Sequence, residues 1–451
     1  MSDTIQHYTE QFSLFEKNGA SKSPSWIHDL RKNALAFFNE RGFPNPKEED
    51  WRFTNISPIT KTAFTYSSDA DIESVSSEII SEMLVQNTAQ HRLVFINGHF
   101  SKKDSSIGAL PNGVVVTSIA EAFSLKPELL QQYLGKYATM AQSSFTALNT
   151  AFIKDGAFVY VPKGVEVPEP IHCLFLSTKT EKEKISNIRN LIIIEEEAKA
   201  TVLNSFRGAV ENKNLSNVVT EIIAKEQSQF ELVKVQKESV TSYHYENLYA
   251  HISKESKVDI FSLALGASIA RNDMSGIIDG EAADLNLNGL YITDGEQLID
   301  HHTLMHHIHP NCPSHELFKG ILNGNSRAVF NGKVYVNPEA QKTDSKQTNR
   351  NLLLSDNATI NAKPELEIFA DDVKCTHGAA TGGLNPQSIF YLKSRGVSEE
   401  TSKGILVVGF AAEATAKIKN PSLRHHIDLL VVDHLQEHLG MKDLPEIVHA
   451  Q

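Results

Sequence analysis

The sequence predicts a mainly β fold, a two-sided parallel β-helix (β-solenoid) with N-terminal and C-terminal helical regions. Three observations favour it: a turn pattern that recurs between about residues 189 and 383, period-2 apolar runs after the turns, and almost no helix-period pattern across that stretch. At each turn an acidic or Asn residue, usually followed by Ala, Ser or Gln, opens a run of alternating residues. The turns begin at Glu197, Glu226, Glu255, Glu281, Glu296, Asn325, Glu339 and Asn357.

The spacing of these turns indicates coils stacked on one another. The separations are 29, 29, 26, 15, 29, 14 and 18 residues, which cluster near one unit of about 15 residues or two. Gly or Asp often stands just before the turn residue and supplies turn chemistry, as at Gly280, Gly295, Gly324 and Asp356. A unit with two strands can bury its face on the next unit. A sandwich of antiparallel sheets is the alternative, and strand direction separates the two.

Residues 1–149 are expected to form a mostly helical N-terminal region. From Ser25 onward apolar residues recur at helical spacing, and Gly42 is expected to end that helix. Further helices are expected over residues 72–85, 129–138 and 144–151, and strands over 93–98 and 114–116. We interpret the stretch around Glu49-Asp50-Trp51-Arg52 as a proline-rich loop that a buried Trp51 holds in place.

The β-helix core is expected over residues 150–385, beginning with a strand near 157–165 that turn residues end. A helical C-terminal domain is expected over residues 386–451. Its helices open at Pro386, at Ser398 as an N-cap followed by two acidic residues, and at Ser422. These helices could cap the solenoid or dock a partner protein.

Composition excludes several classes of protein. The chain of 451 residues carries a formal charge of -12, from 55 acidic and 43 basic residues, so a nucleic-acid surface is not expected. Three widely separated cysteines, Cys173, Cys312 and Cys375, suggest no disulfide framework. Neither a signal peptide nor an apolar run of membrane-spanning length is present, so we expect a cytoplasmic protein with no membrane partner. No Gly-x4-Gly-Lys-Ser/Thr loop is present, so no nucleotide site is expected in this chain.

Residues 300–315 hold the densest histidine cluster. Six His and one Cys within this segment could bind zinc or another borderline metal, although their spacing fits no common signature. In a strand, alternate side chains point to opposite faces, so the six imidazoles could not converge on one ion. Hydrogen-bonded imidazoles at a surface or interface are favoured, and a metal site is the alternative.

Cys375 and His377 form the second candidate site. If residues 370–379 form a strand, these two side chains project from one face, about 7 Å apart at their Cα atoms. A thiolate and an imidazole so placed suit iron–sulfur, zinc or copper chemistry. A packed cysteine and a hydrogen-bonded histidine are the structural alternative. A Cys–His hydrolase is disfavoured, because the base would have to lie within hydrogen-bond reach of the thiol.

Several strings resemble the SufB/SufD family of iron–sulfur cluster assembly proteins, most strongly over residues 300–415. Glu49-Asp50-Trp51-Arg52 is similar to the N-terminal element of that family. The other strings are residues 318–322, 329–334, 340–344 with Gln347, 351–355, 363–368, 370–379 and 390–396. The Lys374-Cys375-Thr376-His377-Gly378 string and the small number of cysteines resemble the SufD branch more than the SufB branch.

The resemblance implies a right-handed parallel β-helix and a non-catalytic scaffold that works with SufB and two copies of the ATPase SufC. It implies that SufC docks on the helices after Pro386, that SufB pairs with the end of the β-helix, and that the same edge can form a homodimer. It also implies that His377, and with it Cys375, ligates a transient iron–sulfur cluster shared with SufB. From the residues alone, a β-helix polysaccharide lyase or hydrolase and a histidine-rich metal-binding protein using residues 301–315 stay as alternatives.

Overall fold

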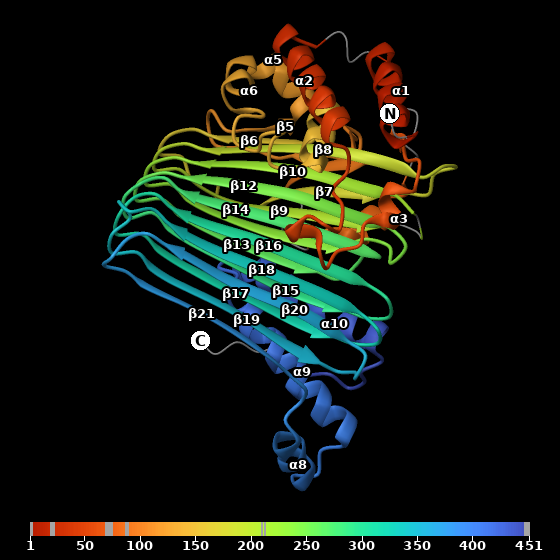
Figure 1. Ribbon diagram of the computed structural model, residues 1–451, viewed down its shortest axis with the longest axis vertical. Helices are drawn as coiled ribbons and strands as arrows, with labels where there is room; N and C mark the ends of the chain where they lie inside the picture. Colours follow the sequence, from red (N-terminus) through yellow and green to blue (C-terminus); the bar gives the residue numbers. More distant parts are fainter. Residues whose placement is uncertain are drawn as a thin grey trace.

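The computed structural model describes residues 3–18, 23–67, 75–85, 90–208, 211 and 213–445. Its centre is a solenoid of two facing sheets (Figure 1). Sheet A has 10 strands: β5 (Val115–Ser118), β6 (Ala157–Val161), β8 (Lys184–Ile194), β10 (Leu215–Ala224), β12 (Tyr243–Ile252), β14 (Ile269–Ile278), β16 (Leu298–His307), β18 (Arg327–Val336) and β20 (Thr359–Ile368), with β1 (Thr65–Tyr66) beside β8.

Sheet B has 11 strands: β3 (His99–Phe100), β2 (His91–Ile96), β7 (Ile171–Ser177), β9 (Lys199–Gly208), β11 (Gln229–Lys237), β13 (Lys257–Ala264), β15 (Asp284–Thr293), β17 (Pro313–Leu322), β19 (Asp344–Leu353) and β21 (Lys374–Gly382), with β4 (Ser106–Ile107) beside β2. From β6 to β21 the chain alternates between the two sheets, and neighbours within each sheet pair in parallel. The predicted parallel solenoid is therefore confirmed, and the antiparallel sandwich is wrong.

The turns lie where the recurring pattern predicts them. Glu197, Gln227, Glu255 and Ala282 adopt left-handed backbone conformations with φ between 55° and 59°. Gly280 does not have a left-handed φ, and glycine is needed there because the neighbouring coil lies too close for a side chain. A Cβ atom at Gly280 would lie 2.0 Å from the backbone nitrogen of Lys254 in the preceding coil. The stacking of one turn on the next therefore requires the absent side chain at this position.

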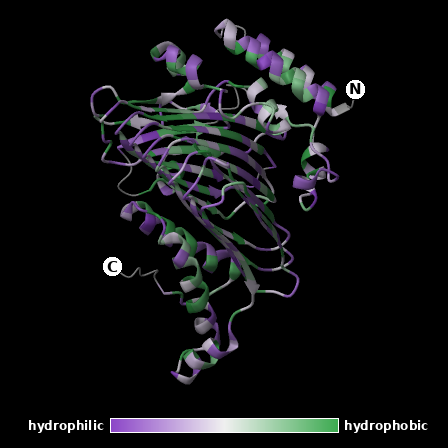
Figure 2. Ribbon diagram, turned by 60° about the vertical axis from the view of Figure 1, so that its left-hand side comes forward, coloured by the Kyte–Doolittle hydropathy of each residue, from purple (hydrophilic) through white to green (hydrophobic). Residues whose placement is uncertain are grey.

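Side chains alternate between the interior of the solenoid and its outer faces. In Figure 2, hydrophobic and hydrophilic colours accordingly alternate along the strands. The interior cluster is largely aliphatic and aromatic, and includes Ile222, Leu232, Leu287 and Phe318. Buried polar side chains also face the interior, such as those of Glu316 and Gln347.

N-terminal helices cover the outer face of sheet A at one end of the solenoid (Figure 1). They are α1 (Asp3–Lys17), α2 (Ser25–Arg41), α3 (Ser57–Thr60), α5 (Ile119–Leu125), α6 (Pro127–Tyr133) and α7 (Ser144–Ala151). Helix α4 (Ser77–Met83) packs instead on sheet B, where Ile80 lies in a cluster with Val94 and Leu174. The helix expected over residues 129–138 ends earlier, since Gly135 takes a left-handed φ of 76°. Residues 72–74 of the expected 72–85 helix lie outside the described residues. The short 3-10 helix η2 (Glu49–Trp51) belongs to the loop that crosses sheet A.

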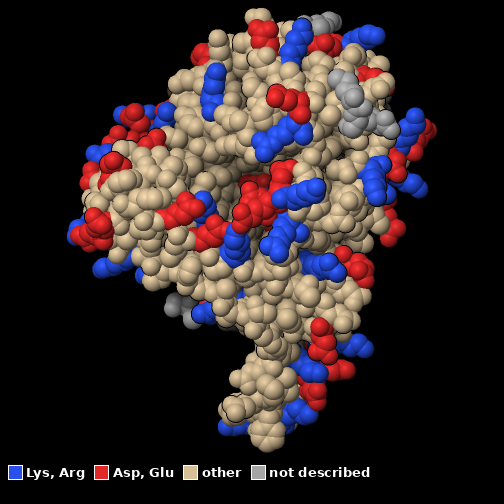
Figure 3. Space-filling model, viewed as in Figure 1, with Lys and Arg blue, Asp and Glu red and all other residues tan. Residues whose placement is uncertain are grey.

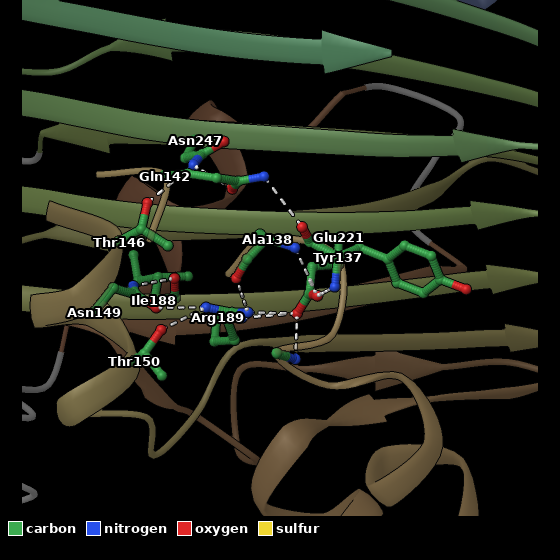
Figure 4. A network of polar contacts seen from close by, with 11 residues as sticks. Tyr137, Ala138, Gln142, Thr146, Asn149, Thr150, Ile188, Arg189, Glu221 and Asn247 are labelled. Atoms are coloured by element: carbon green, nitrogen blue, oxygen red, sulfur yellow. Dashed lines mark hydrogen bonds and ion pairs between the residues drawn. The ribbon is translucent and has the colours of Figure 1, made fainter. Parts of the chain in front are cut away.

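A buried ion pair joins this region to sheet A (Figure 4). Arg189 on β8 bonds Glu221 on β10 through Nε at 3.0 Å and Nη2 at 2.6 Å. Glu221 also accepts the backbone N–H groups of Gly135, Tyr137 and Ala138. The loop after α6 is therefore tied to two coils of the solenoid.

The predicted anchoring of the proline-rich loop by a buried Trp51 is confirmed. The indole stacks on Phe145 at 5.7 Å between ring centroids and on Tyr245 at 6.3 Å. The guanidinium of Arg271 on β14 lies 3.8 Å from the centroid of the indole. An aromatic and cationic contact thus holds the loop against the middle of sheet A.

The C-terminal helices are α8 (Pro386–Ser394), α9 (Glu399–Thr415) and α10 (Pro421–Leu439). Ser398 caps α9 as predicted, while α10 begins earlier than Ser422 because Asn420 provides its cap and Pro421 its first position. Helices α9 and α10 pack on outward apolar residues of sheet B, among them Val233, Phe261, Leu290 and Ile321. Helix α8 extends beyond the end of the solenoid (Figure 1). Within the described residues, no helix is both long and apolar enough to cross a membrane.

Candidate functional site

The last coil of the solenoid carries the Cys375–His377 pair. The turn before β21 is held by Asp372 N–H, which donates to Gln341 Oε1 at 2.9 Å, and by Lys374 N–H, which donates to Thr343 O at 2.8 Å. β21 then pairs in register with β19, so Cys375 stands over Ser345 and His377 over Gln347. In the described part of the chain β21 pairs only with β19, so its other edge is open.

Cys375 and His377 lie on one face of β21, the face that continues the solenoid interior. Their register partners Ser345 and Gln347 are both buried. Cys375 is half-buried and packs against the interior cluster, whereas His377 is exposed at the open end. Burial raises the pKa of the Cys375 thiol, and the backbone N–H of Ser345 acts in the opposite direction. The thiol is therefore protonated near neutral pH, and metal ligation would release its proton.

These two side chains can supply two ligands, one soft and one borderline. Iron–sulfur clusters are commonly held by four protein ligands. Among the residues that the structure describes, no group of three or more His, Cys, Asp or Glu side chains is arranged to hold a metal ion. A cluster at Cys375 and His377 would accordingly need further ligands from another molecule beside the open edge.

A polar pair lies directly beneath His377, and the sequence patterns did not identify its role. Gln347 Nε2 donates to Glu316 Oε2 at 2.7 Å, and both side chains are buried. Burial raises the pKa of Glu316 to about 7, against the opposing hydrogen bonds of Thr303 and Gln347. Gln347 is part of a string that resembles the family, but its position below His377 depends on the register between coils, which the sequence did not reveal.

The histidine-rich segment spreads its side chains in different directions. His301 and His307 are buried in the interior, where burial lowers their pKa values to about 3 and about 4. His302 lies near Asp300 on the outer face of sheet A, and His306 contacts Asn337 Oδ1 at 3.0 Å. The remaining two also have different surroundings, His309 near Asp279 in a turn and exposed His315 on β17. The expectation that the six do not converge on one ion agrees with this geometry.

A separate depression lies on the outer face of sheet A, below the N-terminal loop. Its volume is about 260 Å³, and its lining includes Arg52, Phe53, His302, Asn331 and Lys363. Acidic and basic side chains are mixed on this face of the molecule (Figure 3). Within it Lys363 bonds Glu49 at 2.5 Å and thereby connects the loop to β20. This depression is lined by different residues from the Cys375–His377 site.

Comparison with known proteins places these features in a family. The family model described as SUF system FeS cluster assembly, SufBD core domain, matches residues 175–410, and that of the SufBD protein N-terminal region matches residues 2–173. An iron-sulfur cluster assembly SufBD family protein of Synechocystis sp. is 32% identical over 409 residues, which cover 89% of each chain. The iron-sulfur cluster assembly protein SufD of Escherichia coli is 27% identical over 421 residues, 92% of this chain and 93% of that one. SufD of Bacillus subtilis is 26% identical over 419 residues, 90% and 92% of the two chains.

Proposed function

The chain belongs to the SufBD family of iron–sulfur cluster assembly proteins, and we propose that it is a SufD-like, non-catalytic scaffold subunit of a SUF complex. In this proposal it works in the cytoplasm with SufB and the ATPase SufC, and the cluster is cargo that is assembled and passed on. The observation that carries the proposal is the Cys375–His377 pair at the open end of the solenoid.

The open end suits a partner that completes the ligand set. Strands β20 and β21 are the terminal strands of the two sheets, and Ile368 and Phe369 are exposed beside them. Unpaired strand edges can pair with another chain. In our proposal SufB binds at the open edge of β20 and β21 in the working complex. A second copy of this chain binds there when SufB is absent. The cluster would then be shared between Cys375, His377 and the partner.

The C-terminal helices are the proposed docking site for SufC. Helix α8 has no buried residue, and Phe390 and Tyr391 are 74% and 57% exposed on it. Removing all of residues 386–451 would also uncover the apolar residues of sheet B that α9 and α10 bury. A double change, Phe390→Ala with Tyr391→Ala, is therefore the sharper test. It should weaken copurification of SufC with an unchanged thermal unfolding temperature, and undiminished SufC binding would contradict this docking site.

The test of the cluster site is the iron and acid-labile sulfide content of the complex, purified without oxygen. His377→Ala should lower both contents while SufB and SufC still copurify. Cys375→Ala should lower the iron and sulfide contents as much as His377→Ala if the thiol is a ligand, and less if the thiol mainly packs. The exposed His315 on β17 offers a matched control, because His315→Ala should change neither content. A His377→Ala complex with full iron and sulfide would remove His377 from the ligand set.

A further inference from the structure

One interior column of sheet B leads directly to His377. The register pairs Leu287 with Glu316, Glu316 with Gln347, and Gln347 with His377. Adjacent parallel strands lie about 4.8 Å apart, so each side chain in the column stands one step beneath the next. Glu316 and Gln347 are buried and His377 is exposed at the end. The column therefore runs from a buried carboxyl group to the proposed ligand.

The contact between Glu316 and Gln347 determines how the amide is turned. When Glu316 is ionised, as at mildly alkaline pH, its carboxylate can only accept hydrogen bonds, so it takes the Nε2 group of Gln347, at 2.7 Å. The amide oxygen, Gln347 Oε1, is left buried and without a hydrogen-bond partner among the described residues. Gly332 on the facing sheet provides the space, because a Cβ atom there would lie 2.4 Å from Gln347 Nε2. The amide nitrogen thus occupies a place that a side chain at residue 332 would fill.

The unpaired oxygen needs a donor, and the next side chain in its column is an imidazole. Buried acceptors in proteins are nearly always paired. A neutral imidazole carries one N–H donor and one bare nitrogen, and a hydrogen bond to the donor decides which nitrogen is bare. Histidines that ligate metals usually donate their other ring N–H to a neighbouring acceptor, which fixes the tautomer and the ring orientation.

We propose that Gln347 is a positioning residue for His377: its Oε1 accepts one ring N–H, held in place by Glu316, and leaves the other nitrogen for the metal atoms of the cluster. The bond is not formed in the structure, where Oε1 has no partner, so the exposed imidazole of His377 must turn to make it. For its purpose the inference rests on the proposed function. Gln347 itself touches no cluster atom. It acts through His377, and Glu316 acts through Gln347.

The tautomer of His377 can be measured without any metal. The full chain, labelled with 15N at its 19 histidines, is recorded by long-range 1H–15N correlation at mildly alkaline pH, and the His377 signals are identified by their loss in His377→Ala. In the unaltered chain the two ring nitrogens should show one dominant tautomer. Gln347→Met removes the acceptor, and Gln347→Asn withdraws it by one methylene. Both should move the two nitrogen shifts toward the averaged values of a free imidazole.

Controls separate orientation from general disturbance of the last coils. Lys346 is the exposed, outward-facing neighbour of Gln347, so Lys346→Met should leave the His377 signals unchanged. Glu316→Met should also average the shifts, because it frees the amide to rotate. Averaged shifts in the unaltered chain would overturn the inference. If one of the two variants, Gln347→Met or Gln347→Asn, does not fold, the other serves as the test. Unchanged His377 nitrogen shifts in a folded variant would also overturn the inference.

A second measurement connects the geometry to cluster binding. In the complex purified without oxygen, loss of a partner of this kind should weaken metal affinity about 10- to 100-fold, so Gln347→Met should lower iron and sulfide as His377→Ala does. The two hypotheses fail differently. If His377→Ala keeps full iron and sulfide, the ligand proposal fails while the tautomer result stands. If the tautomer is insensitive to Gln347 but His377→Ala loses the cluster, only the positioning role fails.

Discussion

Arg189→Met tests how strongly the N-terminal region is attached to the solenoid. Arg189 and Glu221 are fully buried, and the guanidinium donates to Glu221, Thr150 and the carbonyl of Ala138. Methionine fills much of the same volume but donates nothing. The variant therefore leaves a buried carboxylate without its cation and leaves the Ala138 carbonyl without this donor (Figure 4).

The expected cost is about 3 kcal/mol. Removing one partner of a buried ion pair typically costs about 3–5 kcal/mol, since the remaining charge is desolvated and uncompensated. Glu221 keeps three backbone donors, at 2.8, 3.1 and 3.1 Å, which favours the lower end of that range. Adding Glu221→Gln removes the uncompensated charge. Its NH2 group would then face at least one of the three backbone N–H donors, so the second change should recover only part of the loss. The double variant should be more stable than Arg189→Met alone.

Tryptophan fluorescence reports this region selectively during urea unfolding. The chain has two tryptophans, Trp26 and Trp51, and both lie in the N-terminal region. The control is Lys163→Met, which breaks an exposed pair with Glu196 and should lower the free energy of unfolding by much less than Arg189→Met does. A loss in Arg189→Met no larger than in the control would refute the reasoning, as would a double variant less stable than the single one.

Three further changes test other parts of the structure. The folded pKa of Glu316 is raised to about 7 from 4.5, so its contribution to stability is fully present below about pH 4.5 and is lost as pH rises through about 7. Between about pH 5 and about pH 8, the free energy of unfolding should therefore fall by up to about 3 kcal/mol less in Glu316→Gln than in the unaltered chain, as measured by thermal unfolding. An equal fall in both chains would contradict the raised pKa of Glu316. Phe318→Ala in the interior should cost about 3–5 kcal/mol in urea unfolding, whereas Phe390→Ala on α8 should cost less than about 0.5. Gly280→Ala should lower the unfolding temperature because its Cβ would collide with Lys254 N, and an unchanged temperature would mean that the turn moves freely.

Much of the solenoid follows from the sequence, because turn residues and alternation are local features. Glu197 and Glu255 adopt the left-handed conformations of tight turns, and the runs after them are the strands. The covering helices could not be assigned to faces in the same way. Phe261 on the outside and Leu287 on the inside are both apolar and buried, so only the position of α9 and α10 distinguishes the two faces.

The candidate site was predictable only within one strand. Alternation alone places Cys375 and His377 on a common face, since they are two residues apart. Gln347 pairs with His377 from 30 residues earlier in the chain, and Glu316 pairs with Gln347 from 31 residues earlier still. Turns of unequal length separate these coils, so one residue more or fewer in any of them would have placed another side chain beneath the imidazole.

The attachment of α10 has a consequence for how the chain folds during synthesis. Each coil packs mainly on its neighbours, so the solenoid can grow as the ribosome delivers successive turns. Glu231, on β11, is synthesised long before its hydrogen-bond donors, the backbone N–H groups of Lys419 and Asn420. It accepts these two bonds at 2.6 and 3.1 Å. Until that late segment emerges, the outward apolar residues of sheet B stay in water. We therefore expect the nascent chain to bind chaperones through this face until α9 and α10 have emerged from the ribosome.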